Sequence, residues 1–217
     1  MFNRVFLVGD ALGIPALLKS IDADKIAGVI IASIRDDLDS TLKKKLHARN
    51  IPIFIQPRVQ SPQYSIFYES LRALKPDCLI CHSYSMLIRE DILKLVQFNA
   101  FNLHAAYLPH NRGPNPIQWA IIHGDTYTGV TLHRMDATFD TGDIITQYKE
   151  PIYFDDTWVS LNKRLATLTS KLIQNILPNL LLGQFLDTPQ PKTSTHKNTR
   201  LTSTSPCIQF ETMTNIE

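Results

Sequence analysis

The stretch FNLHAAYLPHNRGPNPIQW, Phe101 to Trp119, decides how the rest of the chain is interpreted. It begins as the end of an apolar strand, in which Asn102 and His104 are two residues apart and therefore point to the same face. A loop rich in Pro and Gly follows. A helix then begins at Asn115 and Pro116, residue types favoured at the N-cap and at the first helical position. The pattern predicts a polar pair at the carboxyl end of a strand, where open α/β sheets bind ligands.

A second segment, FDTGD at Phe139 to Asp143, supplies a carboxylate later in the chain. Its glycine-containing turn is suited to bringing Asp140 back beside the imidazole of His104. Taken singly, each residue type is more often structural, because Asn and Asp at strand ends commonly close turns. Together, Asn102, His104 and Asp140 offer a hydrogen-bond donor, a proton carrier and an orienting carboxylate, and we interpret them as catalytic. Asp143 is interpreted as structural.

Apolar strands alternate with helical segments through the first hundred residues. We expect strands over 4–8, 28–32, 51–55 and 77–81, and helices over 15–21, 37–49, 63–74 and 89–95. A helix over 116–123, strands over 128–135 and 144–148, and a long amphipathic helix from Trp158, ended or kinked by Pro178, complete the pattern. This order predicts an α/β protein: a Rossmann-like, mostly parallel open sheet with helices on both faces and an antiparallel hairpin.

Length and composition indicate one ordinary globular domain. The chain has 217 residues, 44% hydrophobic and 19% charged, with a net charge of +2 that argues against a surface built around a long polyanion. Its apolar runs are shorter than the roughly 18 residues needed to span a bilayer, and an odd number of cysteines, three, suggests no disulfide framework. We expect a cytoplasmic protein with a catalytic domain over 1–188 and a short, partly disordered polar tail over 189–217.

Two other motifs leave alternatives open. The Gly9 to Gly13 turn is either a tight strand-to-helix connection, the favoured interpretation, or a backbone cradle for a substrate phosphate. Cys78 and Cys81 have the spacing of a metal pair, but no second cluster completes a site, so we expect buried thiols and no metal. Three further histidines are placed outside the catalytic group, with His133 expected on a solvated strand face: His110, His123 and His133.

Five elements of the sequence occur in a recognisable order. They are Asn102-Leu103-His104, Leu108-Pro109, Arg112-Gly113, Gly129-Val130-Thr131 and Asp140-Thr141-Gly142-Asp143-Ile144. In this respect the chain resembles the formyltransferases that use 10-formyltetrahydrofolate. These enzymes formylate glycinamide ribonucleotide, initiator methionyl-tRNA or nucleotide-linked amino sugars. The resemblance extends over about residues 1–185 and is strongest from Asp77 to Lys149.

The resemblance implies a formyl transfer from 10-formyltetrahydrofolate to an amine. Asn102 would donate to the developing oxyanion, His104 would carry the proton or stabilise the charge, and Asp140 would orient the imidazole. Two segments would bind the folate, the first by main-chain groups and apolar side chains: Met86, Leu87 and Ile88, and Asp136, Ala137 and Thr138.

The loop after His104 looks most like that of sugar N-formyltransferases acting on dTDP-, UDP- or GDP-linked 4-amino sugars. It implies Tyr107, Arg112, Gly113 and Asn115 as substrate-binding residues, with bracing of the loop as the alternative for Arg112. The short tail and small net charge weigh against tRNA as the acceptor. The expected partner is therefore a small molecule, not nucleic acid or a membrane. A homodimer is compatible with this expectation. Glycinamide ribonucleotide and methionyl-tRNA stay open as acceptors, and so does a catalytically silent folate- or nucleotide-binding module.

Overall fold

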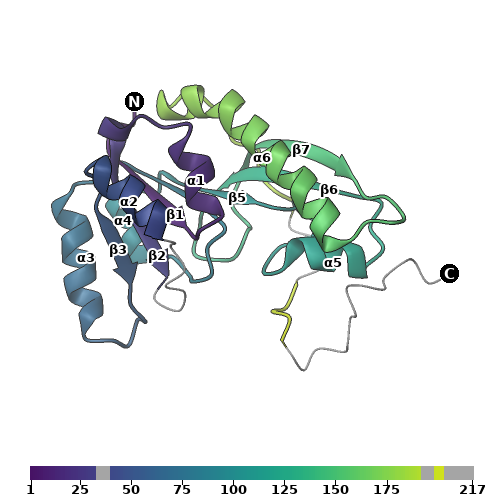
Figure 1. Ribbon diagram of the computed structural model, residues 1–217, viewed down its shortest axis with the longest axis horizontal. Helices are drawn as coiled ribbons and strands as arrows, with labels where there is room; N and C mark the ends of the chain where they lie inside the picture. The colour runs from purple at the N-terminus through teal and green to yellow at the C-terminus, as the bar shows by residue number, and fades with distance from the viewer. Residues whose placement is uncertain (33–39, 192–197, 203–217) are drawn as a thin grey trace.

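The protein is seen here as a computed structural model that describes residues 1–32, 40–191 and 198–202. In this part of the chain seven strands form one sheet, in the order β3-β2-β1-β4-β5-β6-β7 (Figure 1). The strands are β1 (Val5–Gly9), β2 (Ile26–Ala32), β3 (Ile53–Gln56), β4 (Cys78–His82), β5 (Ala100–His104), β6 (Tyr127–Arg134) and β7 (Ile144–Pro151). The helices are α1 (Gly13–Leu18), η1 (Ala23–Lys25, a 3-10 turn), α2 (Ser40–Ala48), α3 (Gln63–Ala73), α4 (Glu90–Leu95), α5 (Pro116–Ile122) and α6 (Trp158–Leu181).

The sheet confirms the predicted fold class. Strands β3, β2, β1, β4 and β5 pair in parallel, whereas β6 is antiparallel to both β5 and β7. Because the chain leaves β1 for β2 and β3 on one side and returns to β4 on the other, the connections diverge between β1 and β4. In open α/β sheets such a point, at the carboxyl ends of the strands, is where ligands bind.

Two apolar cores lie on the two faces of the sheet. One face packs against residues of α1, α2 and α6, including Leu17, Leu46 and Leu172, which are fully buried. The other packs against α3 and α4 through residues such as Leu71 and Leu93. Burying one such side chain contributes about 1.5 to 3 kcal/mol, so both layers hold the strands in register.

Helix α6 begins as its sequence predicts. Thr157 is the N-cap, and its side chain accepts from the Ser160 N–H (3.2 Å) while the Ser160 hydroxyl accepts from the Thr157 N–H (3.0 Å). This reciprocal capping satisfies two backbone donors that the helix itself leaves unpaired. Pro178 does not end the helix, which continues to Leu181.

The predicted boundaries differ from the structure by a few residues at most ends. The helix expected over 37–49 is described only from Ser40, since 37–39 lie outside the described residues. The disorder expected at the end of the tail concerns residues 203–217, which also lie outside them. Four residues of the tail contact the loop that follows β5: Gln190, Pro191, Asn198 and Leu201.

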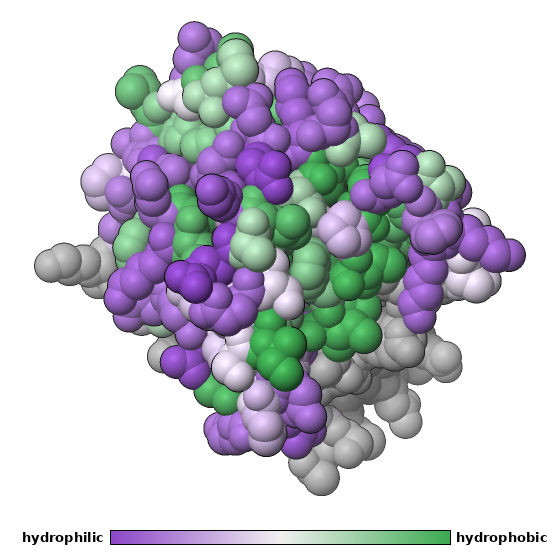
Figure 2. All heavy atoms as spheres, turned by 90° about the vertical axis from the view of Figure 1, so that its left-hand side faces the viewer, coloured by the Kyte–Doolittle hydropathy of each residue, from purple (hydrophilic) through white to green (hydrophobic). Residues whose placement is uncertain are grey.

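Figure 2 views the edge of the sheet that carries β3 and α3, where hydrophobic residues gather among hydrophilic ones. Exposed apolar side chains on these elements and the connection between them include Ile55, Val59 and Ile66. None of the described helices combines the length and apolar character needed to cross a membrane.

Candidate functional site

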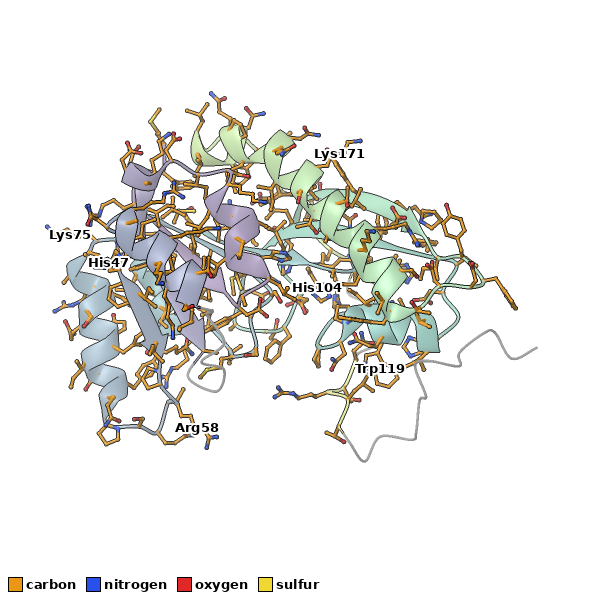
Figure 3. All side chains as sticks on the ribbon, viewed as in Figure 1. His47, Arg58, Lys75, His104, Trp119 and Lys171 are labelled. Atoms are coloured by element: carbon orange, nitrogen blue, oxygen red, sulfur yellow. The ribbon has the colours of Figure 1, made fainter. Side chains whose placement is uncertain are left out.

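The predicted polar pair lies at the carboxyl end of β5, on one face of the sheet. Asn102 pairs with His133 of β6 and His104 with Thr131, so these four side chains share that face. His104, Thr131 and His133 are almost fully buried, with 7%, 0% and 2% of their surface exposed. In Figure 3, His104 lies between the parallel part of the sheet and the hairpin. The neighbouring antiparallel strand thus completes a site that β5 begins.

Asp140 returns to this face, as the sequence predicts. Its Oδ1 accepts a hydrogen bond from Asn102 Nδ2 (3.1 Å), and its Oδ2 accepts one from the Gly113 backbone N–H (2.9 Å). The Oδ2 atom also lies 3.6 Å from His104 Nδ1, and Oδ1 lies 3.4 Å from His133 Nε2. One carboxylate therefore contacts β5, β6 and the loop after β5.

The surroundings keep Asp140 ionised. Burial alone would raise its pKa, but the two histidines, His104 and His133, and the Gly113 N–H together outweigh burial and hold the pKa of Asp140 well below its ordinary range. The carboxylate consequently carries its negative charge at any pH near neutrality. It is suited to stabilising an imidazolium beside it.

The hydrogen bonds of His104 determine which of its nitrogens carries the hydrogen. Nε2 lies 2.9 Å from the carbonyl oxygen of Asn111, which can only accept, so Nε2 must be the donor. In the neutral ring the lone pair is then on Nδ1, the nitrogen that faces Asp140. His104 is therefore oriented to accept a proton at Nδ1, beside the group that would stabilise the resulting charge.

The expectation that His133 lies on a solvated face is wrong. The side chain is buried, its Nδ1 lies 2.7 Å from the Arg134 carbonyl, and its Nε2 lies 3.2 Å from Asn102 Nδ2. Since the carbonyl accepts from Nδ1, a neutral ring accepts from Asn102 at Nε2. His133 thus supports the amide of Asn102, a role that antiparallel pairing with β5 creates. The other two histidines contact aromatic rings elsewhere, His110 that of Tyr127 and His123 that of Trp119.

The residues proposed for substrate binding lie in and around the loop after β5. The Tyr107 ring packs edge-on against Tyr127 (5.8 Å between centroids), and Lys149 Nζ lies over the Tyr127 ring at 3.5 Å. Arg112 is buried, and its guanidinium donates to Gln190 Oε1 and to the Pro191 carbonyl. These contacts correspond to the bracing alternative for Arg112.

The backbone of the same loop is held close to the carboxylate. Gly113 adopts a φ of +95°, and a Cβ there would lie 3.0 Å from the Asn198 carbonyl oxygen, so a glycine suits this contact. Asn115 stands at the N-cap of α5, as predicted, but its side chain does not cap the helix. Its φ is +57°, and its Oδ1 accepts from the Leu201 N–H (3.1 Å) instead.

The segment proposed to bind folate by main-chain groups, Met86 to Ile88, connects β4 to α4. Ile88 is buried and Leu87 is 44% exposed. The Leu87 carbonyl accepts from Gln56 Nε2 (3.0 Å), and the Tyr84 hydroxyl donates to Gln56 Oε1 (2.9 Å). The peptide groups of Met86 and Ile88 make no hydrogen bond to another described residue. Gln56 holds the segment from one side. Ile88 is buried, whereas the partly exposed peptide group of Met86 stays available to a ligand.

The second segment expected to bind folate, Asp136 to Thr138, forms the loop before Asp140. The Asp136 carboxylate accepts from the Thr138 N–H (2.8 Å) and from the Thr141 hydroxyl (2.7 Å), which closes the loop on itself. Ala137 and Thr138 are exposed, and Phe139 beside them has 58% of its surface exposed. This loop therefore presents its backbone and one apolar ring to solvent.

The Gly9 to Gly13 turn corresponds to the strand-to-helix connection. Asp10 Oδ1 accepts from the N–H groups of Leu12 (2.9 Å) and Gly13 (3.0 Å), and Oδ2 accepts from the Ser83 hydroxyl (2.8 Å). A carboxylate of the chain itself thus occupies the donors that a phosphate would need. A Cβ at Gly9 or Gly13 would lie 2.4 or 2.0 Å from the His82 carbonyl oxygen, which explains both glycines.

The expectation of buried thiols is confirmed for the two cysteines that the structure describes. Cys78 and Cys81 are buried and free, and burial raises the pKa of each thiol. Across residues 1–32, 40–191 and 198–202, no group of three or more His, Cys, Asp or Glu side chains could hold a metal ion.

The open α/β sheet thus carries an amide, an imidazole and an ionised carboxylate close together, a combination suited to moving a proton. Residues 4–177 match the formyl transferase family, and the chain belongs to that family.

Similar proteins include members that act on different acceptors. The methionyl-tRNA formyltransferase of Myxococcus xanthus is 35% identical over 150 residues, 69% of this chain and 47% of that protein. The chain spans less than half the length of the curated relatives it matches.

Among solved structures, the formyltransferase PseJ of Anoxybacillus kamchatkensis, in complex with UDP-4,6-dideoxy-4-formamido-L-AltNAc and tetrahydrofolate, has a TM-score of 0.59 at 25% identity. The match covers 89% of this chain and 85% of that one. The phosphoribosylglycinamide formyltransferase of Bacillus halodurans has a TM-score of 0.71 at 23% identity, covering 82% and 95%.

Proposed function

We propose that this protein transfers a formyl group from 10-formyltetrahydrofolate to the amino group of a nucleotide-linked 4-amino sugar. The observation that carries the proposal is the meeting of Asn102, His104 and Asp140 at the carboxyl edge of the sheet, with distances of 3.1 Å and 3.6 Å from the carboxylate to the other two. Membership in the formyl transferase family supports the reaction class. The bound sugar nucleotide and tetrahydrofolate named for PseJ support the acceptor and the donor.

The residues around the site suit a reduced folate. A flat heteroaromatic ring needs apolar walls and a few fixed polar groups. The peptide group of Met86 would face the edge of the ring, with the exposed side chains of Leu87 and Phe139 as apolar neighbours. The folate, when bound, supplies the formyl group that the amine receives.

His104 would move the proton. Its Nε2 hydrogen is committed to the Asn111 carbonyl, so Nδ1 takes the proton from the amine as the new C–N bond forms. Asp140 stabilises the resulting imidazolium without accepting its proton, because the pKa of the carboxyl is held low. His104 then returns the proton to the nitrogen that loses the formyl group, which balances the reaction.

Asn102 would stabilise the formyl oxygen as negative charge develops on it. In the structure its two amide hydrogens are directed at Asp140 and at His133 Nε2. Donation to the oxygen therefore requires one of these hydrogen bonds to be exchanged. The longer one, to the neutral ring of His133 (3.2 Å), is the natural choice, because the bond to charged Asp140 is the stronger type.

The test is a transfer assay with labelled 10-formyltetrahydrofolate over a panel of acceptors. The panel holds dTDP-, UDP- and GDP-linked 4-amino sugars, glycinamide ribonucleotide and methionyl-tRNA, with the His104→Ala variant as the control. The proposal predicts label in a sugar nucleotide with the wild-type chain only. Label in the ribonucleotide or in the tRNA would overturn the assigned acceptor, and folate binding without any transfer would favour a silent binding module.

A further inference from the structure

Gln190, in the segment after α6, joins the two loops that meet at the carboxylate of Asp140. Its Nε2 donates to the carbonyl oxygens of Asp140 (3.1 Å) and Gly142 (2.6 Å). Its Oε1 accepts from Nε (3.1 Å) and Nη2 (2.7 Å) of Arg112. One side chain therefore ties the loop that carries Arg112 and Gly113 to the loop that carries Asp140.

The backbone at Asp140 needs such support. Asp140 has a φ of +57°, in the left-handed region that residues with a Cβ enter at an energetic cost. Two residues later the chain passes so close to β6 that a Cβ on Gly142 would lie 2.1 Å from the Arg134 carbonyl oxygen. The two carbonyls that accept from Gln190 thus belong to Asp140, whose backbone is strained, and to Gly142, which lies against Arg134.

The chemistry of the bridge fits a carboxamide. Two carbonyl oxygens on one side can only accept hydrogen bonds, and the Arg112 guanidinium on the other side can only donate them. A primary amide presents two donors and an acceptor, so it satisfies both sides at once. A carboxylate would pair with Arg112 alone, and an apolar side chain would pair with neither.

The position of Gln190 is itself fixed. Thr188 exchanges two backbone hydrogen bonds with Ile144 at the start of β7, both 2.8 Å long, and the Pro191 carbonyl accepts from Arg112 (2.9 Å). After residues 192–197, which the structure does not describe, the Asn198 N–H donates to the Arg112 carbonyl (3.0 Å). Trp119 Nε1 donates to the Thr199 carbonyl, and Figure 3 shows Trp119 beside this segment.

We propose that Gln190 is a positioning residue for the formyl transfer, an inference that rests on the function proposed above. It holds Asp140 where the carboxylate accepts from the Gly113 N–H and faces His104. Gln190 acts through the backbone of Asp140, because its side chain hydrogen-bonds the Asp140 carbonyl and not the side chains of Asn102, His104 or Asp140.

The experiment compares full-length Gln190→Ala and Gln190→Glu with the wild type in the transfer assay and by hydrogen exchange at the Gly113 amide. Both variants lose the two donors to the carbonyls, while Gln190→Glu keeps an acceptor for Arg112. At neutral pH, kcat should fall about fivefold to 100-fold in both, as expected for two lost hydrogen bonds, with KM values changed less than about twofold. Exchange at Gly113 should accelerate, because its acceptor moves.

A rescue distinguishes positioning from general support. The carboxyl introduced by Gln190→Glu gains a hydrogen to donate when it is protonated, so its kcat relative to wild type should recover toward acidic pH. That of Gln190→Ala should not. The matched control is Asp187→Asn, in the same segment as Gln190. It removes the ion pair between Asp187 and Arg134 of β6 and should leave kcat and Gly113 exchange unchanged.

Unchanged kcat and unchanged Gly113 exchange in both Gln190 variants would overturn the inference, and so would equal losses in Asp187→Asn. The two proposals fail separately. A wild type that transfers no formyl group to any acceptor refutes the function, whereas Gly113 exchange still decides whether Gln190 positions Asp140.

Discussion

Two aspartates lie in loops that follow strands of the sheet, and their carboxylates are held in different ways. Asp10 follows β1, and its Oδ1 is satisfied by the N–H groups of its own turn, at Leu12 and Gly13. Asp140 precedes β7, and it is satisfied by Gly113 and Asn102, 27 and 38 residues away, with two imidazoles beside it. A carboxylate satisfied mainly within its own turn stabilises local structure. A carboxylate that side chains from several strands and loops surround can orient them together, and this is the role proposed for Asp140.

Replacing His104 should have the largest effect on the site around Asp140. His104→Ala removes the group proposed to carry the proton, so kcat should fall by about 100-fold to 10,000-fold. The rate is measured by transfer of labelled formyl group at saturating substrates, and the melting temperature serves as a control for folding. A rate within threefold of wild type would exclude His104 from the mechanism.

Asn102→Ala should follow closely. Loss of a donor to a developing oxyanion typically costs about 100-fold to 1000-fold in kcat. The effect should appear in kcat rather than in KM for the folate, because the hydrogen bond forms as charge develops. An increase in KM alone would instead assign Asn102 to ligand binding.

The buried His133 should matter less. His133→Asn removes the acceptor at Nε2 for the Asn102 amide. Because this hydrogen bond is the one proposed to be exchanged when Asn102 donates to the formyl oxygen, its loss should change kcat by less than about threefold. Steady-state kinetics of the variant measure it, and a loss as large as that of His104→Ala would mean that His133 itself carries the proton.

Acid stability should separate the two aspartate regions further. The pKa of Asp140 is lower in the folded chain than in the unfolded chain, mainly because His104 and His133 outweigh the opposing effect of burial. Its ionisation therefore stabilises the fold above about pH 3.9, the ordinary unfolded value, and this contribution is lost as pH falls below it toward the folded pKa. The stability advantage of wild type over Asp140→Asn should shrink from pH 5 to pH 3 in denaturant titrations, and an advantage that grows would contradict this assignment.

The turn after β1 should show the smallest effect on catalysis and a measurable one on stability. Asp10→Ala leaves the N–H groups of Leu12 and Gly13 without their acceptor, at a cost of about 1 to 2 kcal/mol in unfolding free energy. The rate of formyl transfer should stay within about threefold of wild type. A large loss of rate with normal stability would make this turn part of the site.

The sequence predicts the features that depend on local periodicity. The spacing of Asn102 and His104 on one strand gives their common face, and the alternating strands and helices give the sheet with its hairpin. The position of His133 depends on the register between β5 and β6, which places it opposite Asn102. The alternation of Thr131 and His133 with Val130 and Leu132 predicts that Thr131 and His133 share one face. It does not predict which strand pairs with β6.

Side-chain partners far apart in sequence are the other part that local patterns do not reveal. Asn115 has the residue type of an N-cap, yet its side chain binds Leu201 because the tail passes beside it. Gln190 lies in a polar stretch with no periodicity, and only its contacts with Arg112, Asp140 and Gly142 distinguish it from its neighbours. Both depend on how a segment after α6 returns to the loop after β5.

The most direct measurement is the single-turnover rate of formyl transfer to a 4-amino sugar nucleotide for Asp140→Asn and Asp10→Asn, two variants that make the same chemical change at the two carboxylates. The account predicts a rate at least about 100-fold below wild type for Asp140→Asn, and a rate near wild type for Asp10→Asn. Equal rates for the two variants would contradict it.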